Sequence, residues 1–391
     1  MLLLMRLFRY LLLLFLFFLC ESICSARIIP HNEKSIGESP KQLHVVVLIP
    51  EPKVAPFWHS LLTVMLAAAK DLYIDLEIQT LAPGEHNRFS LLDRFEAIGI
   101  SNTKPDYFIS PLQLGVEKEL LEIIEKYQLN YVSINSYIPA SQYALLGKPR
   151  EKYRHWLGHI SPNDFLVGKE LAEYLFQVTK ANMKHEKSFN LIGITAPKSS
   201  LVGQQRAKGL FQALEHRPEF MLAQVAYSNW NKDETFSKVD KLLKRHENIS
   251  ILWSVSGDIA LGALAAVKEN NLVPGRDVFI GGIDWTEDGL AAIKKGEMEV
   301  SYGGHFLDGA KALILAYDHY NGHDFTDHMS AIIETKLRAI THQNVLFFER
   351  FFKKTRWDEL NFKKFSLFEQ PAKRKYDFEI ENFLILNKKG N

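Results

Sequence analysis

Clusters of histidine and carboxylate side chains are where this sequence could hold a metal. His155 and His159 are four positions apart, but they fall in an apolar run that predicts a strand, and no glutamate follows the first histidine as it does in zinc-protease helices. The richest cluster runs from Asp318 to His328 and could ligate zinc. A helix is expected to end there, at Asn321-Gly322, so solvated cap residues are the reading we favour, and we predict no metal.

Sequence motifs for nucleotide binding or acyl transfer are missing. There is no phosphate-binding loop, no G-x-G-x-x-G after an expected strand and no G-x-S-x-G turn that would display a nucleophilic serine. Catalytic pairs of carboxylates cannot be assigned, because the sequence does not say which acids face one another. We therefore predict neither an enzyme nor a bound cofactor.

Both cysteines, Cys20 and Cys24, lie in an N-terminal segment that is typical of an export signal. Two arginines precede an apolar run from Tyr10 to Cys20, which is shorter than the roughly 20 residues that a membrane-spanning helix needs. Small residues place the expected cleavage after Ala26, so that residues 1–26 form the signal peptide; an uncleaved anchor is the alternative. The mature chain would then contain no disulfide and no thiol nucleophile.

Composition and length indicate an ordinary globular protein of about two domains. The chain has 391 residues, 47% of them hydrophobic and 24% charged. Its 47 Lys and Arg residues stand against 46 Asp and Glu residues. A chain so close to neutrality has no overall electrostatic reason to bind nucleic acid, and we predict no nucleic-acid partner.

Expected strands and helices alternate from residue 44 to residue 295. Continuous apolar runs such as His44–Ile49 predict strands that are buried on both faces. The expected strands are 44–49, 74–80, 107–110, 131–134, 155–160, 189–194, 221–227, 250–254 and 277–282, and most are followed by helical patterns of 10–15 residues. Such alternation predicts an α/β fold with parallel sheets, and the number of units favours two doubly wound lobes over one sheet.

The pattern changes from about Thr341, and residues 341–391 form an aromatic and basic C-terminal extension. It contains Phe347, Phe348, Phe351, Phe352, Trp357, Phe362, Phe365 and Phe368 among Lys353, Lys354, Arg356, Lys363 and Lys364. The interpretation that we favour is an extension that lays its aromatic side chains on the two lobes and leaves its lysines in solvent. A docking surface for a membrane partner is the alternative.

Four segments together resemble the type I periplasmic binding proteins, in particular the ribose-receptor-like sugar-binding group. They are residues 44–59, 204–215, 256–270 and 279–301, and the last is the most specific. The resemblance runs from about Leu43 to about Leu337. It implies an N-terminal lobe of residues 41–161 completed by about 304–333, a C-terminal lobe of residues 162–303, and three chain crossings near Ser161, Gly303 and Ile333.

The resemblance also implies a set of sugar-binding residues, because a sugar offers apolar faces and a rim of hydroxyls. Phe57 and Trp58 stand where the family stacks a ring from one lobe, and Trp230 stands where the other lobe supplies its ring. Core packing is the alternative for each. Arg206 matches an arginine that donates to ligand hydroxyls, with an interlobe salt bridge as its alternative.

One further pair of predicted ligand residues follows the expected strand 277–282. Asp284 matches an aspartate that accepts from two ligand hydroxyls, and its alternative role is to cap the helix that begins near Thr286. Trp285, beside it, is predicted to add another aromatic plate.

Four positions depart from the ribose pattern and argue against ribose itself. Asn135 stands at the start of a pair where the group has Asp-Arg, and Glu51 stands where the group often has Ser. His305 falls in a segment that usually contains Gln. Asp258 follows a glycine that replaces Asn, and we favour a helix cap over a ligand contact for it. All four are kept as candidate ligand residues.

The function implied is that of an exported, periplasmic and monomeric receptor that closes on a sugar or sugar-like ligand. Two membrane partners are open: the permease of an ATP-driven importer, or a sensor kinase or cyclase for which the protein is a co-receptor. An enzyme on the same scaffold is a third reading. A repressor is not expected, since the expected signal occupies the place of a DNA-binding helix-turn-helix.

Overall fold

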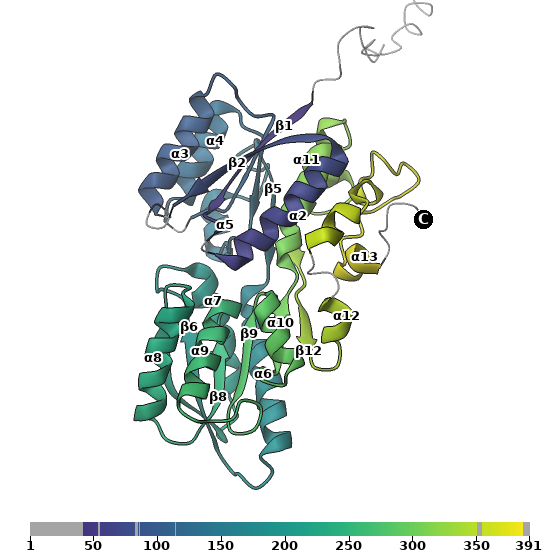
Figure 1. The fold of residues 1–391 in the computed structure, drawn as a ribbon. Coiled ribbons are helices and arrows are strands. Elements are labelled where there is room, and N and C mark those ends of the chain that lie inside the picture. Colours follow the sequence, from purple (N-terminus) through teal and green to yellow (C-terminus); the bar gives the residue numbers. More distant parts are fainter. Residues whose placement is uncertain are drawn as a thin grey trace, which may run out of the picture. The chain divides into compact units, whose positions relative to one another are not determined.

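The computed structural model describes residues 42–53, 55–82, 85, 87–113, 115–349 and 354–385 (Figure 1). The predicted signal peptide and the phenylalanines at 351 and 352 lie outside these ranges. In the described ranges, no helix is both long and apolar enough to cross a membrane.

The first sheet contains six parallel strands in the order β2-β1-β3-β4-β5-β11. The strands are β1 (Leu43–Pro50), β2 (Ile74–Leu81), β3 (Tyr107–Ser110), β4 (Tyr131–Ile134), β5 (Trp156–Pro162) and β11 (Ile332–Thr335). Its helices are α2 (Pro56–Leu72), α3 (Arg88–Ile100), α4 (Glu117–Tyr127), α5 (Ala140–Leu146) and α11 (Asp308–Tyr320).

The apolar run of β1 is buried on both faces because helices cover both sides of the sheet. Val45 and Val47 belong to the core that includes Leu61 of α2 and Leu313 of α11. Val46, with the opposite orientation, belongs to the core formed with α3 and α4. The alternation of side chains along a strand therefore divides one apolar run between two layers.

The second sheet also has six strands, in the order β7-β6-β8-β9-β10-β12, and only β12 runs antiparallel to its neighbour. The strands are β6 (Phe189–Thr195), β7 (Phe220–Tyr227), β8 (Ile249–Ser254), β9 (Phe279–Ile283), β10 (Val300–Gly303) and β12 (Arg338–Thr341). Its helices are α6 (Asp164–Asn182), α7 (Leu201–Leu214), α8 (Lys232–Arg245), α9 (Gly257–Glu269) and α10 (Glu287–Lys294).

The chain passes between the two sheets three times. It crosses after β5, again between β10 and α11 through the short helix η1 (His305–Leu307), and finally between β11 and β12. Buried Lys311 links the last two crossings, since its Nζ lies 2.8 Å from Asp308 Oδ1 and 3.1 Å from Thr335 Oγ1. The predicted fold class, two doubly wound lobes joined by three crossings, is confirmed, and the third crossing falls just beyond Ile333.

The C-terminal extension packs along the lobes through α12 (Val345–Glu349), η3 (Lys354–Glu359), η4 (Phe362–Phe365) and α13 (Ile380–Ile385). Phe362, Phe365 and Phe383 are buried, and Phe365 and Phe383 stack with 4.0 Å between ring centroids. Among the described residues of this segment, most aromatic side chains thus form core. Phe368 remains 38% exposed.

Candidate functional site

A buried cluster of polar side chains lies at the carboxyl ends of the strands of the second sheet. The carboxylate of Asp284, which follows β9, lies between the guanidinium of Arg206 and the imidazole of His305. Arg206 Nη1 is 3.9 Å from Asp284 Oδ1, and His305 Nε2 is 3.2 Å from the same oxygen. In parallel α/β sheets, ligands bind outside the carboxyl ends of the strands, so these three predicted residues meet where a ligand is expected.

Arg206 is fixed by helix packing and by hydrogen bonds on two sides. Helices α6 and α7 approach closely at Gly168, where an added Cβ would lie 2.1 Å from the carbonyl oxygen of Arg206. The guanidinium donates from Nε to Asp164 Oδ1 at 2.8 Å and from Nη1 to the carbonyl of Val255 at 2.9 Å. With 2% of its surface exposed, Arg206 has a defined orientation before any ligand binds.

Asp284 has a strained backbone and does not cap the following helix. Its φ is +81°, a region that residues with a Cβ adopt rarely, and its N–H donates to the carbonyl of Tyr302 at 2.7 Å. The N-cap of α10 is Thr286, whose side chain accepts from the N–H of Gly289. The capping role that the sequence offered as an alternative for Asp284 is therefore wrong, and its carboxylate is free for another role.

The pKa values of the two carboxyl groups that flank Arg206 are shifted in opposite directions. Burial alone would raise the pKa of Asp284, but the hydrogen bond from His305 and the charge of Arg206 outweigh it, and the pKa is lowered. Burial raises the pKa of Asp164 despite its contact with Arg206. Asp284 is thus held as a carboxylate, the form that accepts hydrogen bonds from hydroxyls.

His305 lies at the second crossing and contacts residues of both lobes. Its imidazole stacks on the ring of Phe57 with 4.6 Å between centroids, while Nε2 faces Asp284. Trp58 packs edge-on against Phe57 at 5.1 Å. His305 is 2% exposed, and its Nδ1 has no hydrogen-bond partner among the described residues. A buried polar atom of this kind is available to a ligand or to water.

Two more predicted residues combine strained backbones with available side chains. Asn135, after β4, has a φ of +45°, and its buried Oδ1 lacks a partner within the described part of the chain. Trp230, after β7, has a φ of +57° and remains 37% exposed. Together with Asp284, they place left-handed backbone after three of the parallel strands. Strain of this kind tends to collect at binding sites.

Asp258 is not the cap that the sequence favoured. Ser256 caps α9 by accepting from the N–H of Ile259, and Asp258 lies in the first turn. Burial, followed by the negative charge of Asp284, raises the pKa of Asp258 to about 6. The carboxyl therefore lies close enough to Asp284 to feel its charge, and Asp258 stays a candidate.

The side chains of two predicted ligand residues, Glu51 and Trp285, contact groups outside the cluster around Arg206. The carboxylate of Glu51 accepts from Thr80 Oγ1 at 3.1 Å on the adjacent strand. Trp285 is 3% exposed, donates to the carbonyls of Ser301 and Arg338, and packs against Phe348 of the extension at 4.9 Å. Burial under the extension argues against the role of an aromatic plate for Trp285, and we leave it out of the site.

Sequence reasoning missed Asp164, which is the closest partner of Arg206. The only signal was an acidic residue in the first turn of a helix, and such residues usually serve the helix dipole. The histidine and carboxylate cluster from Asp318 to His328, for which we expected solvated cap residues, is different in the structure. Asp318 is fully buried and accepts hydrogen bonds from the extension, so the expectation of a solvated cap is wrong for it. In the described ranges, no three metal-binding side chains come together.

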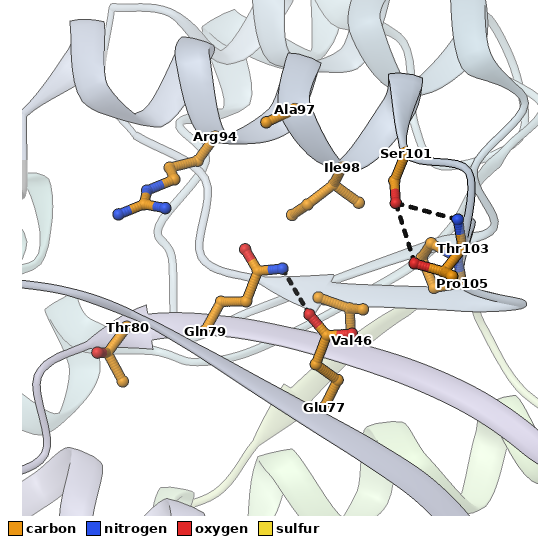
Figure 2. Close-up of a pocket in the computed structure, with 10 residues that line it drawn as sticks. All are labelled: Val46, Glu77, Gln79, Thr80, Arg94, Ala97, Ile98, Ser101, Thr103 and Pro105. Carbon is orange, nitrogen blue, oxygen red and sulfur yellow. Dashed lines mark hydrogen bonds between the residues drawn. The ribbon is translucent and has the colours of Figure 1, made fainter.

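A separate hollow lies at the edge of the first sheet, between β2 and α3 (Figure 2). It encloses about 320 Å³ and is lined partly by polar side chains, among them Glu77, Gln79 and Arg94. Gln79 donates to Glu77 across its floor at 2.7 Å. None of the predicted ligand residues lines this hollow, so it is distinct from the cluster around Arg206.

Residues 46–324 match the family described as periplasmic binding protein domain, which covers more than half of the chain. The chain therefore belongs to the periplasmic binding protein family, whose members bind ligands and are not enzymes. The resemblance drawn from the sequence is confirmed.

Individual proteins that are similar to this chain share only low sequence identity with it. A periplasmic sugar-binding protein from Pseudomonas fluorescens superposes with a TM-score of 0.77 at 24% identity, over 88% of this chain and 99% of that one. The Caulobacter myo-inositol binding protein gives a TM-score of 0.64 at 18% identity, over 80% and 97% of the two chains. The galactofuranose-binding protein YtfQ of Escherichia coli K12 is 25% identical over 92 residues, which are 23% of this chain and 29% of that protein.

Proposed function

We propose that this protein is an exported receptor that closes on a sugar or a sugar-like polar ligand at the cluster of Arg206, Asp284 and His305. One observation carries the proposal: the buried arginine, the lowered-pKa carboxylate and the half-partnered histidine converge at one point. Planar donors and acceptors of this kind suit a rim of hydroxyls. The names of structurally similar proteins, which include sugar and inositol binders, agree with this ligand class.

The aromatic residues complete the proposed site. Phe57, stacked on His305, and the exposed Trp230 supply apolar surfaces for the C–H faces of a sugar ring. Asn135 adds a buried carbonyl oxygen from the first lobe. Residues of both lobes thus contribute, and binding is coupled to hinge bending without any covalent step.

For the partner, we propose the membrane permease of an ATP-driven importer. The alternative, a co-receptor for a membrane sensor, drew its support from the aromatic extension. Since Phe362, Phe365 and Phe383 are buried against the protein's own core, they do not form a docking surface. Their burial weakens the support for the sensor alternative, and delivery to an importer remains the function that we propose.

The test is a thermal-shift screen of the purified protein against neutral sugars, polyols and small polar metabolites. A ligand at 100 times its Kd should stabilise the fold by about 2.7 kcal/mol. We expect Trp230→Ala and Asp284→Asn to weaken the hit strongly, and Phe368→Ala, an equally exposed aromatic on the extension, to leave it unchanged. A protein that melts cooperatively but responds to nothing in the panel would speak against a sugar receptor.

A further inference from the structure

The guanidinium of Arg206 is already matched by negative charge. Asp164 Oδ1 lies 2.8 Å from Nε, and Asp284 Oδ1 lies 3.9 Å from Nη1. All three side chains are buried or nearly so. An arginine that recognises a carboxylate or phosphate must offer its charge and its paired donors to the ligand. In this protein, one donor edge of the Arg206 guanidinium and most of its positive charge already interact with the protein's own carboxyl groups.

Asp164 lies in the first turn of α6 but does not cap this helix. The N-cap of this helix is Asn163, whose Oδ1 accepts from the N–H of Leu166 at 3.0 Å. Asp164 itself is 1% exposed, and its Oδ2 finds no partner in the part of the chain that is described. Burying a carboxylate with one oxygen unsatisfied is costly, which indicates that its contact with Arg206 serves the site.

Carboxyl groups surround the guanidinium of Arg206. Asp164 Oδ1 lies on one side of it and Asp284 Oδ1 on the other, and His305 Nε2 faces the same oxygen of Asp284 at 3.2 Å. An anionic group that enters this buried cluster would meet repulsion that solvent hardly screens. A neutral hydroxyl meets no such penalty and can still take the remaining donors of Arg206.

We propose that Asp164 is a specificity-determining residue: it neutralises Arg206, so that the site accepts neutral hydroxylated ligands and rejects anionic ones such as uronates and phosphates. The proposal rests on the sugar-binding function proposed above. It assigns to Asp164 a role in ligand selection in addition to its structural contact with Arg206.

The experiment compares three probes by calorimetric titration: D-galactose, D-galacturonate and inorganic phosphate. They are titrated into the wild type, Asp164→Asn, Asp164→Glu and Asp318→Asn. The amide in Asp164→Asn can still accept from Arg206 Nε but carries no charge. Asp164→Glu keeps the charge, and Asp318→Asn removes a buried carboxylate that contacts only the extension.

In the wild type we expect galacturonate to bind at least about tenfold more weakly than galactose, and phosphate not to bind. Asp164→Asn should lower the galactose-to-galacturonate preference about tenfold and admit phosphate. Asp164→Glu and Asp318→Asn should keep the wild-type preference. Galacturonate that binds the wild type as tightly as galactose, or an unchanged preference in a folded Asp164→Asn protein, would overturn the proposal.

Two further results are also decisive. If Asp164→Asn does not fold, Asp164→Ser serves as the second neutral variant, judged by the same ratio. If neither D-galactose nor D-galacturonate binds the wild type, the sugar-binding function fails for this ligand set. The phosphate titration then still decides the role of Asp164: phosphate binding to the neutral variant alone supports it, and no gain in phosphate binding contradicts it.

Discussion

At the scale of single residues, the site depends on one buried arginine held between acids. Arg206 donates to Asp164 and to the carbonyl of Val255, and it lies within 4 Å of Asp284. Such a guanidinium cannot be replaced by a flexible ammonium without loss, because a lysine lacks the planar fork. The ligand affinity and the stability of the site should therefore depend together on this side chain.

The first prediction concerns Arg206→Lys. We expect ligand affinity to fall about 10- to 100-fold, since a hydrogen bond to a charged group contributes about 1.5–3 kcal/mol. The free energy of unfolding should also fall by a few kcal/mol, because Asp164 loses its ideal partner. Calorimetry with the ligand from the screen and urea denaturation measure the two effects. Wild-type affinity in this variant would show that Arg206 does not contact the ligand.

The second prediction concerns the pH dependence of stability through Asp258. The folded chain raises the pKa of Asp258 from an ordinary 3.8 to about 6, so the native state holds the proton more tightly than the unfolded state. The stabilising contribution is complete below about pH 4 and is lost as the pH rises through 6. Lys232 and Asp288 also act on this carboxyl, and the neighbouring Asp284 is its main charged influence.

Asp258→Asn should therefore gain stability relative to the wild type as the pH rises from 4.5 to 7.5, by about 1–2 kcal/mol after solvent screening. Urea denaturation at several pH values measures the difference, and Asp377→Asn, an exposed acid on the extension, is the control. A difference that is constant over this pH range would contradict the assignment.

Site residues could be predicted from the sequence where they match the family pattern. They could not be predicted where the packing of another segment determines whether a side chain reaches the site. Arg206 and Asp284, which match the family pattern, lie 3.9 Å apart, and His305, which departs from that pattern, lies 3.2 Å from Asp284. Trp285 was expected in the site but lies under Phe348, because the path of the extension cannot be read from its aromatic content. Asp164 was missed because an acid in the first turn of a helix looks like an ordinary dipole partner.

At the scale of elements, the least predictable part is the extension. Its aromatics were expected to lie on the lobes, and Phe362 and Phe365 are indeed buried. The sequence analysis did not foresee that the extension is anchored at Asp318. Asp318, at the end of α11, accepts from the N–H of Leu367 at 2.7 Å and from the hydroxyl of Tyr376 at 2.8 Å. Long parallel strands were easier to predict, because their apolar runs, such as that of β1, are continuous.

The third prediction is that Asp318→Ala loosens the extension. Several buried hydrogen-bonding groups lose their acceptor, so we expect a loss of about 2–4 kcal/mol in the free energy of unfolding. Hydrogen exchange in residues 362–383 should accelerate. Mass spectrometry of exchange measures this, with Asp377→Ala, which removes an exposed acid on the same segment, as the control. Unchanged protection of this segment would mean that Asp318 is not its anchor.

At the scale of the whole molecule, three crossings connect the lobes, and His305 lies at one of them. Its contacts with Phe57 on one side and Asp284 on the other place a proposed ligand residue at the hinge itself. A ligand held by groups of both lobes binds the closed form better than the open one, and it shifts the population accordingly.

The fourth prediction follows from this coupling. Saturating ligand should reduce the radius of gyration of the wild type in small-angle X-ray scattering, because closure brings the lobes together. The scattering of Asp284→Asn should not change at the same ligand concentration. A wild-type ligand complex with the scattering of the free protein would mean that binding is not coupled to closure.

The most direct measurement is a crystal structure with the ligand identified by the screen. The account predicts ligand hydroxyls within hydrogen-bonding distance of Arg206 and Asp284, and a ring against Trp230 or Phe57. Ligand density elsewhere, for example in the hollow between β2 and α3 (Figure 2), with the Arg206 cluster unchanged, would contradict it.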